Sequence, residues 1–192
     1  MTQLLFNGAR IAVLEGGDQA QLNEIRSRMT SAGALVAGVP REVPFDQAHP
    51  SGFAGLIVAD AAGADSGAAQ VVREFMLADK PVAAIGNGVR ILVAADAVAG
   101  RYIAGADDIR ADVHGAGGEL ADTSIHVDEK LVTARSGKEL HSFLERVVRT
   151  FAAQLEERQI DEVSEQSFPA SDPPPGPGAI GASGESTSEA SA

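Results

Sequence analysis

The chain has 192 residues and contains no cysteine, which excludes disulfides, thiolate metal sites and a cysteine nucleophile. Its 27 acidic and 15 basic residues give a net charge of −12, which argues against binding to duplex nucleic acid or to an anionic membrane surface. The N-terminal region lacks the unbroken apolar stretch of a signal peptide, and no window is apolar enough for a membrane span. We therefore expect a cytoplasmic protein.

Buried strands alternate with amphipathic helices over most of the chain. The predicted strands are Ile11–Leu14, Ala34–Val39, Leu56–Ala59 and Pro81–Ile85, followed by a hairpin of Ile125–Val127 and Leu131–Ala134. Apolar residues three and four positions apart predict helices that begin at Asp18, include Val71–Met76 and Ile91–Leu92, and run from Leu140 to Leu155. Asp18 is the candidate N-cap of the first of these helices. This alternation predicts an α/β fold with a doubly wound, mostly parallel sheet.

The end of the chain has a different composition. The 34 residues from Gln159 onward contain six acidic residues and no basic one, and 21 of them are Ser, Pro, Gly or Ala. Such a segment buries too little apolar surface to offset its ordering entropy. We therefore predict a folded domain over residues 1–158 and a disordered acidic tail over 159–192, in which Ser164–Pro174 is a candidate motif for a protein partner.

The segment from Lys80 to Gly88, Lys-Pro-Val-Ala-Ala-Ile-Gly-Asn-Gly, predicts a strand that enters a sharp turn and then a helix, as in a nucleophile elbow. It resembles the PfpI-type intracellular protease family of the class I glutamine amidotransferase-like superfamily, whose members typically read Lys-Pro-Val-Ala-Ala-Ile-Cys-His-Gly here. Ile109–Val113, Leu131–Arg135 and Lys138–Val148 are similar to later segments of that family, in order. The resemblance covers residues 8–155 and implies a flavodoxin-like fold and a homodimer.

The chain departs from the family at each position that the family's chemistry uses. The nucleophilic Cys is Gly86, and the adjacent His is Asn87. The Glu after the first strand aligns with Asp18, and the Pro-Gly-Gly that supplies an oxyanion-hole amide aligns with Ala59-Asp60-Ala61. The resemblance therefore implies a vestigial pocket of Asp18, Asp60, Gly86 and Asn87 that holds no catalytic residue.

Two functions are compatible with these departures. The first is a catalytically degenerate, non-enzymatic module for binding, assembly or stress protection, like the nucleophile-free domain of this fold in large-subunit catalases. The alternative is a small-molecule hydrolase, deglycase or isomerase-type enzyme that uses Asp18, Asp60 or Glu15 as acid or base. A space above Gly86 filled by Asp60 would favour the module, and an open polar pocket would favour the enzyme.

Other polar groupings predict no further chemistry. Asp108, Asp112 and His114 have the composition of a metal site, but surface carboxylates on a helix are far commoner, and we predict no metal. Gly86-Asn87-Gly88 lacks the third glycine of a dinucleotide fingerprint, and we predict no cofactor. His141 falls on the polar face of the last helix, and no Ser-His-Asp arrangement is visible.

Overall fold

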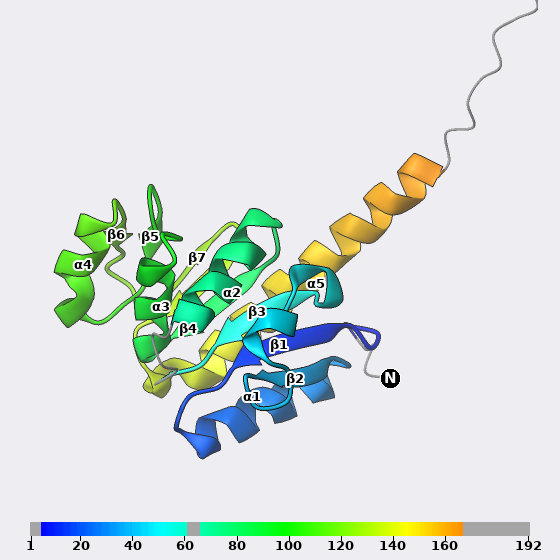
Figure 1. Cartoon of the computed structure of the whole chain (residues 1–192), viewed down its shortest axis with the longest axis horizontal. Coiled ribbons are helices and arrows are strands. Elements are labelled where there is room, and N and C mark those ends of the chain that lie inside the picture. The colour runs from blue at the N-terminus through cyan, green and yellow to red at the C-terminus, as the bar shows by residue number, and fades with distance from the viewer. Residues whose placement is uncertain (1–4, 61–65, 167–192) are drawn as a thin grey trace, which may run out of the picture.

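The computed structural model describes residues 5–60 and 66–166 (Figure 1). The strands are β1 (Arg10–Leu14), β2 (Leu35–Val39), β3 (Gly55–Val58), β4 (Val82–Ile85), β5 (Tyr102–Ile103), β6 (Glu119–Leu120), β7 (Ile125–Asp128) and β8 (Leu131–Ala134). The helices are α1 (Gln19–Ser31), α2 (Ser66–Leu77), α3 (Val89–Ala94), α4 (Arg110–Gly115) and α5 (Leu140–Gln166). Every predicted strand is present, with ends that differ by no more than one residue.

Six of the strands form the central sheet, in the order β2-β1-β3-β4-β8-β7. Neighbouring strands are parallel throughout, except that β7 and β8 form the predicted antiparallel hairpin. The order 2-1-3-4 is that of flavodoxin-like folds. The predicted fold class, a doubly wound and mostly parallel sheet, is thus confirmed.

Alternate residues of the central strands face opposite layers of helices, which is why these strands are apolar without interruption. On one face, Ile11, Ile57 and Ile85 pack against α1 and α5, and all three are fully buried. On the other face, Ala12, Leu56 and Ala84 pack against α2 and α3. Both layers are visible in Figure 1, where α1 and α2 lie on opposite sides of the sheet.

The ring of Phe151 in α5 packs directly on Gly55 of β3. A Cβ at Gly55 would lie 2.5 Å from the ring of Phe151, and Phe151 is fully buried. The glycine therefore sets the distance between the helix and the sheet in this layer.

Helix α5 continues beyond the domain boundary predicted from composition. Arg158, the last residue of the predicted domain, donates a hydrogen bond to the carbonyl oxygen of Asp79 at 2.5 Å, and the helix then projects from the body of the molecule to Gln166 (Figure 1). Residues 159–166, which lie within the predicted tail, are helical, and they contain no glycine or proline to end the helix. The rest of the predicted tail, 167–192, lies outside the described residues.

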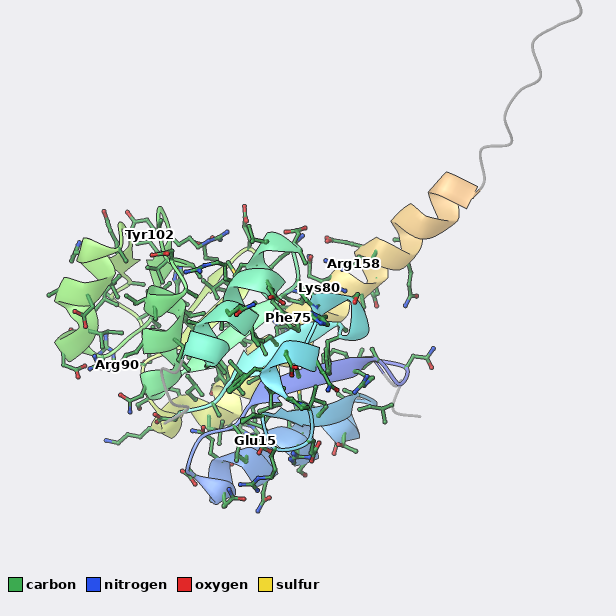
Figure 2. The ribbon with its side chains drawn as sticks, in the orientation of Figure 1. Glu15, Phe75, Lys80, Arg90, Tyr102 and Arg158 are labelled. Atoms are coloured by element: carbon green, nitrogen blue, oxygen red, sulfur yellow. The ribbon has the colours of Figure 1, made fainter. Side chains whose placement is uncertain are left out.

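Small elements beyond α3 form one end of the molecule. The parallel strands β5 and β6 form a separate two-stranded sheet, and the buried hydroxyl of Thr133 ties it to β8 by accepting a hydrogen bond from the Ala104 amide at 2.7 Å. Figure 2 shows Tyr102 at this end, and Lys80 beside Arg158 where α5 leaves the body. Within the described residues, no helix has the length and apolarity needed to cross a lipid bilayer.

Candidate functional site at the carboxyl edge of the sheet

The strands β1, β3, β4 and β8 are parallel, so the residues that follow them meet at one edge of the sheet, where α/β proteins bind their ligands. Glu15 follows β1, and Asp60 comes shortly after β3. Gly86 follows β4, and Arg135 follows β8. The candidate site is built at this edge.

Gly86 forms the predicted elbow between β4 and a short 3₁₀ turn, Gly86–Gly88, that leads into α3. Its φ of +58° lies in the left-handed region, which favours glycine because a side chain there meets the backbone. A Cβ at this position would also overlap the carboxylate of Asp60. Position 86 therefore excludes a side chain for both a backbone and a packing reason.

Asp60 is held against the elbow by polar contacts. Its Oδ1 accepts hydrogen bonds from the backbone N–H of Asn87 at 2.9 Å and from the Asn87 side-chain amide at 3.0 Å. Its own backbone N–H donates to Oε1 of Gln21 at 2.7 Å. The half-buried Asp60 carboxylate thus binds the amide that follows the elbow residue, which is one of the amides that an elbow offers to an oxyanion.

Gln21 was not predicted as part of this site. It lies in the first turn of α1, is only 4% exposed, and is hydrogen-bonded to the loop after β3. Its Nε2 lies near Gly137, where a Cβ would be 3.3 Å away. The signal for it was present in the sequence, because Gln21, Ile25 and Met29 fall on one buried stripe of the helix. A polar residue on such a stripe indicates a buried hydrogen bond.

Asp18 has a different position from the other three predicted residues. As predicted, it is the N-cap of α1: its Oδ1 accepts hydrogen bonds from the backbone amides of Ala20 at 2.9 Å and Gln21 at 3.2 Å. Asp60, Gly86 and Asn87 lie in direct contact, whereas Asp18 is linked to them through Gln21. Its carboxylate therefore caps the N-terminus of α1.

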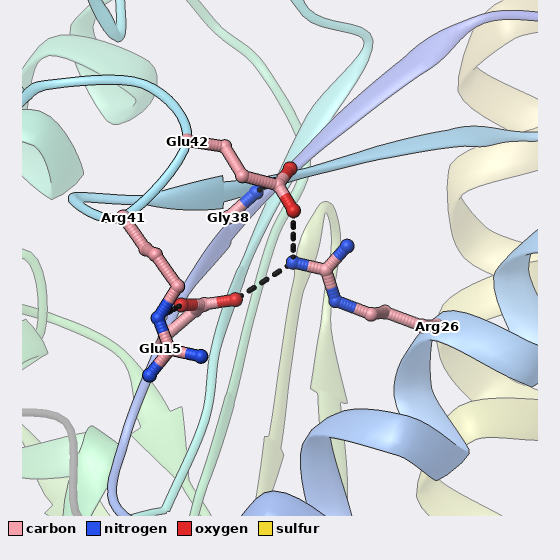
Figure 3. Close-up of polar contacts among 5 residues, drawn as sticks. All are labelled: Glu15, Arg26, Gly38, Arg41 and Glu42. Carbon is pink, nitrogen blue, oxygen red and sulfur yellow. Dashed lines mark hydrogen bonds and ion pairs between the residues drawn. The ribbon is translucent and has the colours of Figure 1, made fainter.

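Glu15 belongs to a cluster of ion pairs between β1, α1 and the turn after β2 (Figure 3). Its side chain is only 6% exposed and lies 2.7 Å from Nη2 of Arg26 and 3.3 Å from Nε of Arg41. The hydrogen bond from Arg26 to Glu15 raises the pKa of the Arg26 guanidinium. Glu15 therefore stabilises the edge of the sheet as a paired anion.

Glu42 completes that cluster. It accepts hydrogen bonds from the backbone amide of Gly38 at 2.9 Å and from Arg26 at 2.8 Å. The bond from the Gly38 amide, above all, lowers the pKa of the Glu42 carboxyl. These contacts bind the turn after β2 to α1.

The acidic residues of the 3₁₀ turn Asp107–Ile109 and of α4 make ion pairs with α3. Arg90 lies 2.6 Å from Asp108 and 3.5 Å from Asp112, and Figure 2 places it beside α4.

His114 is exposed, and no group of three His, Cys, Asp or Glu residues in the described part of the chain is arranged to hold a metal ion. His141 is exposed on α5, as predicted, and lies 3.7 Å from Glu145.

Solved structures of ThiJ/PfpI proteins share this fold. Residues 53–150, about half of the chain, match the model of the DJ-1/PfpI family. The chain belongs to the DJ-1/PfpI family, which confirms the resemblance found in its sequence.

Curated relatives match across most of the domain. The chain is 31% identical over 123 residues to "Protein/nucleic acid deglycase 2" of Escherichia coli strain K12, covering 61% of this chain and 72% of that protein. It is 30% identical over 139 residues to "General stress protein 18" of Bacillus subtilis strain 168, covering 69% and 81%. The crystal structure of a ThiJ/PfpI domain protein from Brachyspira murdochii shares the fold, with a TM-score of 0.64 at 16% identity over 75% of this chain and 95% of that one.

Proposed function

We propose that this chain is a catalytically inactive member of the DJ-1/PfpI family that acts as a binding, assembly or stress-protection module. The observation that carries the proposal is the position of the Asp60 carboxylate, which fills the space beside Gly86 where an elbow side chain would stand. The chain contains no cysteine to supply a thiol nucleophile at this or any other position.

The electrostatics of the elbow also support the proposal. The backbone N–H of Asn87 donates to Asp60, so this amide is already occupied by a negative charge. An oxyanion that developed at the elbow would face repulsion at the place where catalysis requires stabilisation. The Asn87 side chain cannot act as a general base in place of histidine.

A stress-protection role is supported by the relative named "General stress protein 18", which the chain covers over 81% of its length. The proposal includes a homodimer in the cytoplasm, as the family resemblance implies. Light scattering of the full chain after size exclusion tests the oligomeric state. A monomer at micromolar concentration would contradict this part of the proposal.

The alternative is an enzyme that uses carboxylates, and the relative named as a deglycase is the observation that favours it. Of the three carboxylates considered, Asp18 caps a helix and Glu15 is buried in ion pairs. Asp60 alone is half-buried beside the elbow, so this alternative depends on Asp60 as the acid or base.

One assay distinguishes the two functions. The full chain is tested for amidase, protease, deglycase and glyoxalase-type turnover beside a heat-inactivated sample and the Asp60→Asn variant. We expect all three to give the same rate. Turnover by the wild type that is lost in Asp60→Asn would establish the carboxylate enzyme and overturn the inactive module.

The tail remains a candidate binding segment for a protein partner. Because α5 continues to Gln166, the truncation that spares the helix ends at that residue. We expect the shortened chain to keep the wild-type melting temperature while losing a partner that depends on the tail. A partner that binds both forms equally would assign the interaction to the domain.

A further inference from the structure

A polar depression of about 520 Å³ lies at the carboxyl edge of β8, beside the 135–139 segment. It is formed by the loop before β7, the residue after β8 and the start of α5. Its lining residues are Asp122, Thr123, Ser124, Ile125, Arg135, Glu139 and Ser142. The volume is within the range of sites for small molecules.

Arg135 is the cation of this depression, and it forms no ion pair with another described residue. Its backbone N–H donates to the carbonyl oxygen of Ser124 at 2.8 Å, which fixes the residue at the end of the hairpin. Its side-chain Nε is buried and has no hydrogen-bond partner in the part of the chain that the structure describes. The positive charge of Arg135 also acts on Asp107, whose pKa is lowered by its hydrogen bond with Arg110 first and by Arg135 to a smaller extent.

A guanidinium that forms no ion pair within the protein can gain free energy by pairing with a carboxylate of a ligand. The planar guanidinium presents parallel N–H groups whose spacing matches a carboxylate. The positive end of α5, which begins at Leu140 beside the depression, also favours a negative group there. Arg135 therefore points to a ligand that carries a carboxylate.

The other charges in the depression are negative. Asp122 is exposed, and Glu139 is held in place by a hydrogen bond from Ser136 Oγ to its Oε2 at 2.7 Å. Two carboxylates beside one guanidinium disfavour a phosphate dianion and favour a ligand that also carries a cation. The hydroxyls of Thr123, Ser124 and Ser142 provide further hydrogen bonds.

We propose that this depression binds a small zwitterion of the free amino acid class. The ligand carboxylate pairs with Arg135, and its ammonium group pairs with Asp122 and Glu139. This binding does not depend on the proposed loss of activity at the elbow, because the three residues are different from Asp60, Gly86 and Asn87, which form the elbow contacts.

The test is an NMR titration of the ¹⁵N-labelled full chain with three probes of nearly equal shape. L-Serine carries both charges, glycerate replaces the ammonium by a hydroxyl, and serinol replaces the carboxylate by a hydroxymethyl group. We expect saturable shifts at the amides of Ser124, Arg135 and Ser142 with serine, and at least about tenfold weaker binding of either analogue, since one charged contact is lost. Absence of saturable shifts with serine, or equal binding of glycerate, would overturn the proposal.

Variants assign the binding to the depression. Arg135→Gln and Asp122→Asn should each weaken serine binding at least about tenfold, whereas Arg146→Gln and Asp46→Asn, which change the same charges elsewhere, should leave it unchanged. Asp122 is exposed, so Asp122→Asn tests the proposal even where Arg135→Gln fails to fold. Wild-type affinity in a folded Asp122→Asn variant would contradict the assigned ammonium contact.

Discussion

The Asp60 carboxylate occupies the space that a side chain at position 86 would need. The two positions lie at the ends of neighbouring parallel strands, β3 and β4, so their residues meet at the edge of the sheet. An acid at 60 is compatible with glycine at 86, because each fits only where the other leaves room. The two departures from the family pattern are thus physically coupled.

The first prediction concerns Gly86→Cys, which restores the family's residue type without its surroundings. A side chain at φ +58° is strained by about 1–3 kcal/mol, and it must also displace the Asp60 carboxylate. We expect a lower free energy of unfolding in urea and a lower melting temperature. An unchanged or higher melting temperature would contradict this account.

A double-mutant cycle separates the two causes. Gly86→Ala introduces the backbone strain of a side chain at positive φ without adding a thiol. Asp60→Gly removes the carboxylate that a Cβ at position 86 would overlap. If the overlap matters, the double variant should be more stable than the sum of the two single losses predicts, with a coupling of about 0.5–3 kcal/mol. Additive losses would attribute the whole cost to the backbone.

The second prediction concerns Gln21, which joins α1 to the loop after β3. Gln21→Ala leaves the backbone N–H of Asp60 without its acceptor and should lower the free energy of unfolding by about 1–3 kcal/mol. Gln19→Ala, an exposed change in the same turn, is the matched control and should stay within about 0.5 kcal/mol of wild type. Equal effects of the two changes would show that the Gln21 contact is not stabilising.

A third prediction follows from the lowered pKa of Glu42. A carboxyl whose pKa is lower in the folded than in the unfolded state stabilises the fold above its ordinary value of 4.5. This contribution is lost as the pH falls through the folded value. Because the Glu42 side chain is 45% exposed, we expect Glu42→Gln to cost less than about 1 kcal/mol at pH 7.

The difference between Glu42→Gln and wild type should shrink as the pH falls from about 5 to 3 in urea unfolding at several pH values. Glu24→Gln, on the exposed face of α1, controls for the general effect of removing an acid. A difference that stays constant over this range would assign the effect of the variant to packing and not to charge.

Local chemistry made most of the fold predictable. The apolar runs at Ile11–Leu14 and Pro81–Ile85 and the cap at Asp18 act over a few residues, and the structure contains all three. The end of α5 could not be predicted from composition, because residues 159–166 are polar yet have good helix propensity and follow an established helix.

The candidate site was only partly predictable. The elbow and the nearness of Asp60 to Gly86 followed from the family resemblance, since both residues end adjacent strands. Two contacts depend on side-chain directions across three elements. Asp60 accepts two hydrogen bonds from Asn87, and Gln21 accepts a hydrogen bond from the Asp60 amide. A single sequence does not contain that geometry.

The last prediction concerns the contact between α5 and the sheet. A Cβ at Gly55 would lie 2.5 Å from the Phe151 ring, so Gly55→Ala should push the helix outward and cost about 1–3 kcal/mol in urea unfolding. Phe151→Leu removes part of the buried ring and is destabilising alone, but it makes room for the new methyl group. The double variant should therefore lose less than the two single variants together, while Ile160→Ala, at an exposed position of α5, should change stability by less than about 0.5 kcal/mol. Additive losses at positions 55 and 151 would mean that the glycine is needed for the strand itself and not for the approach of the helix.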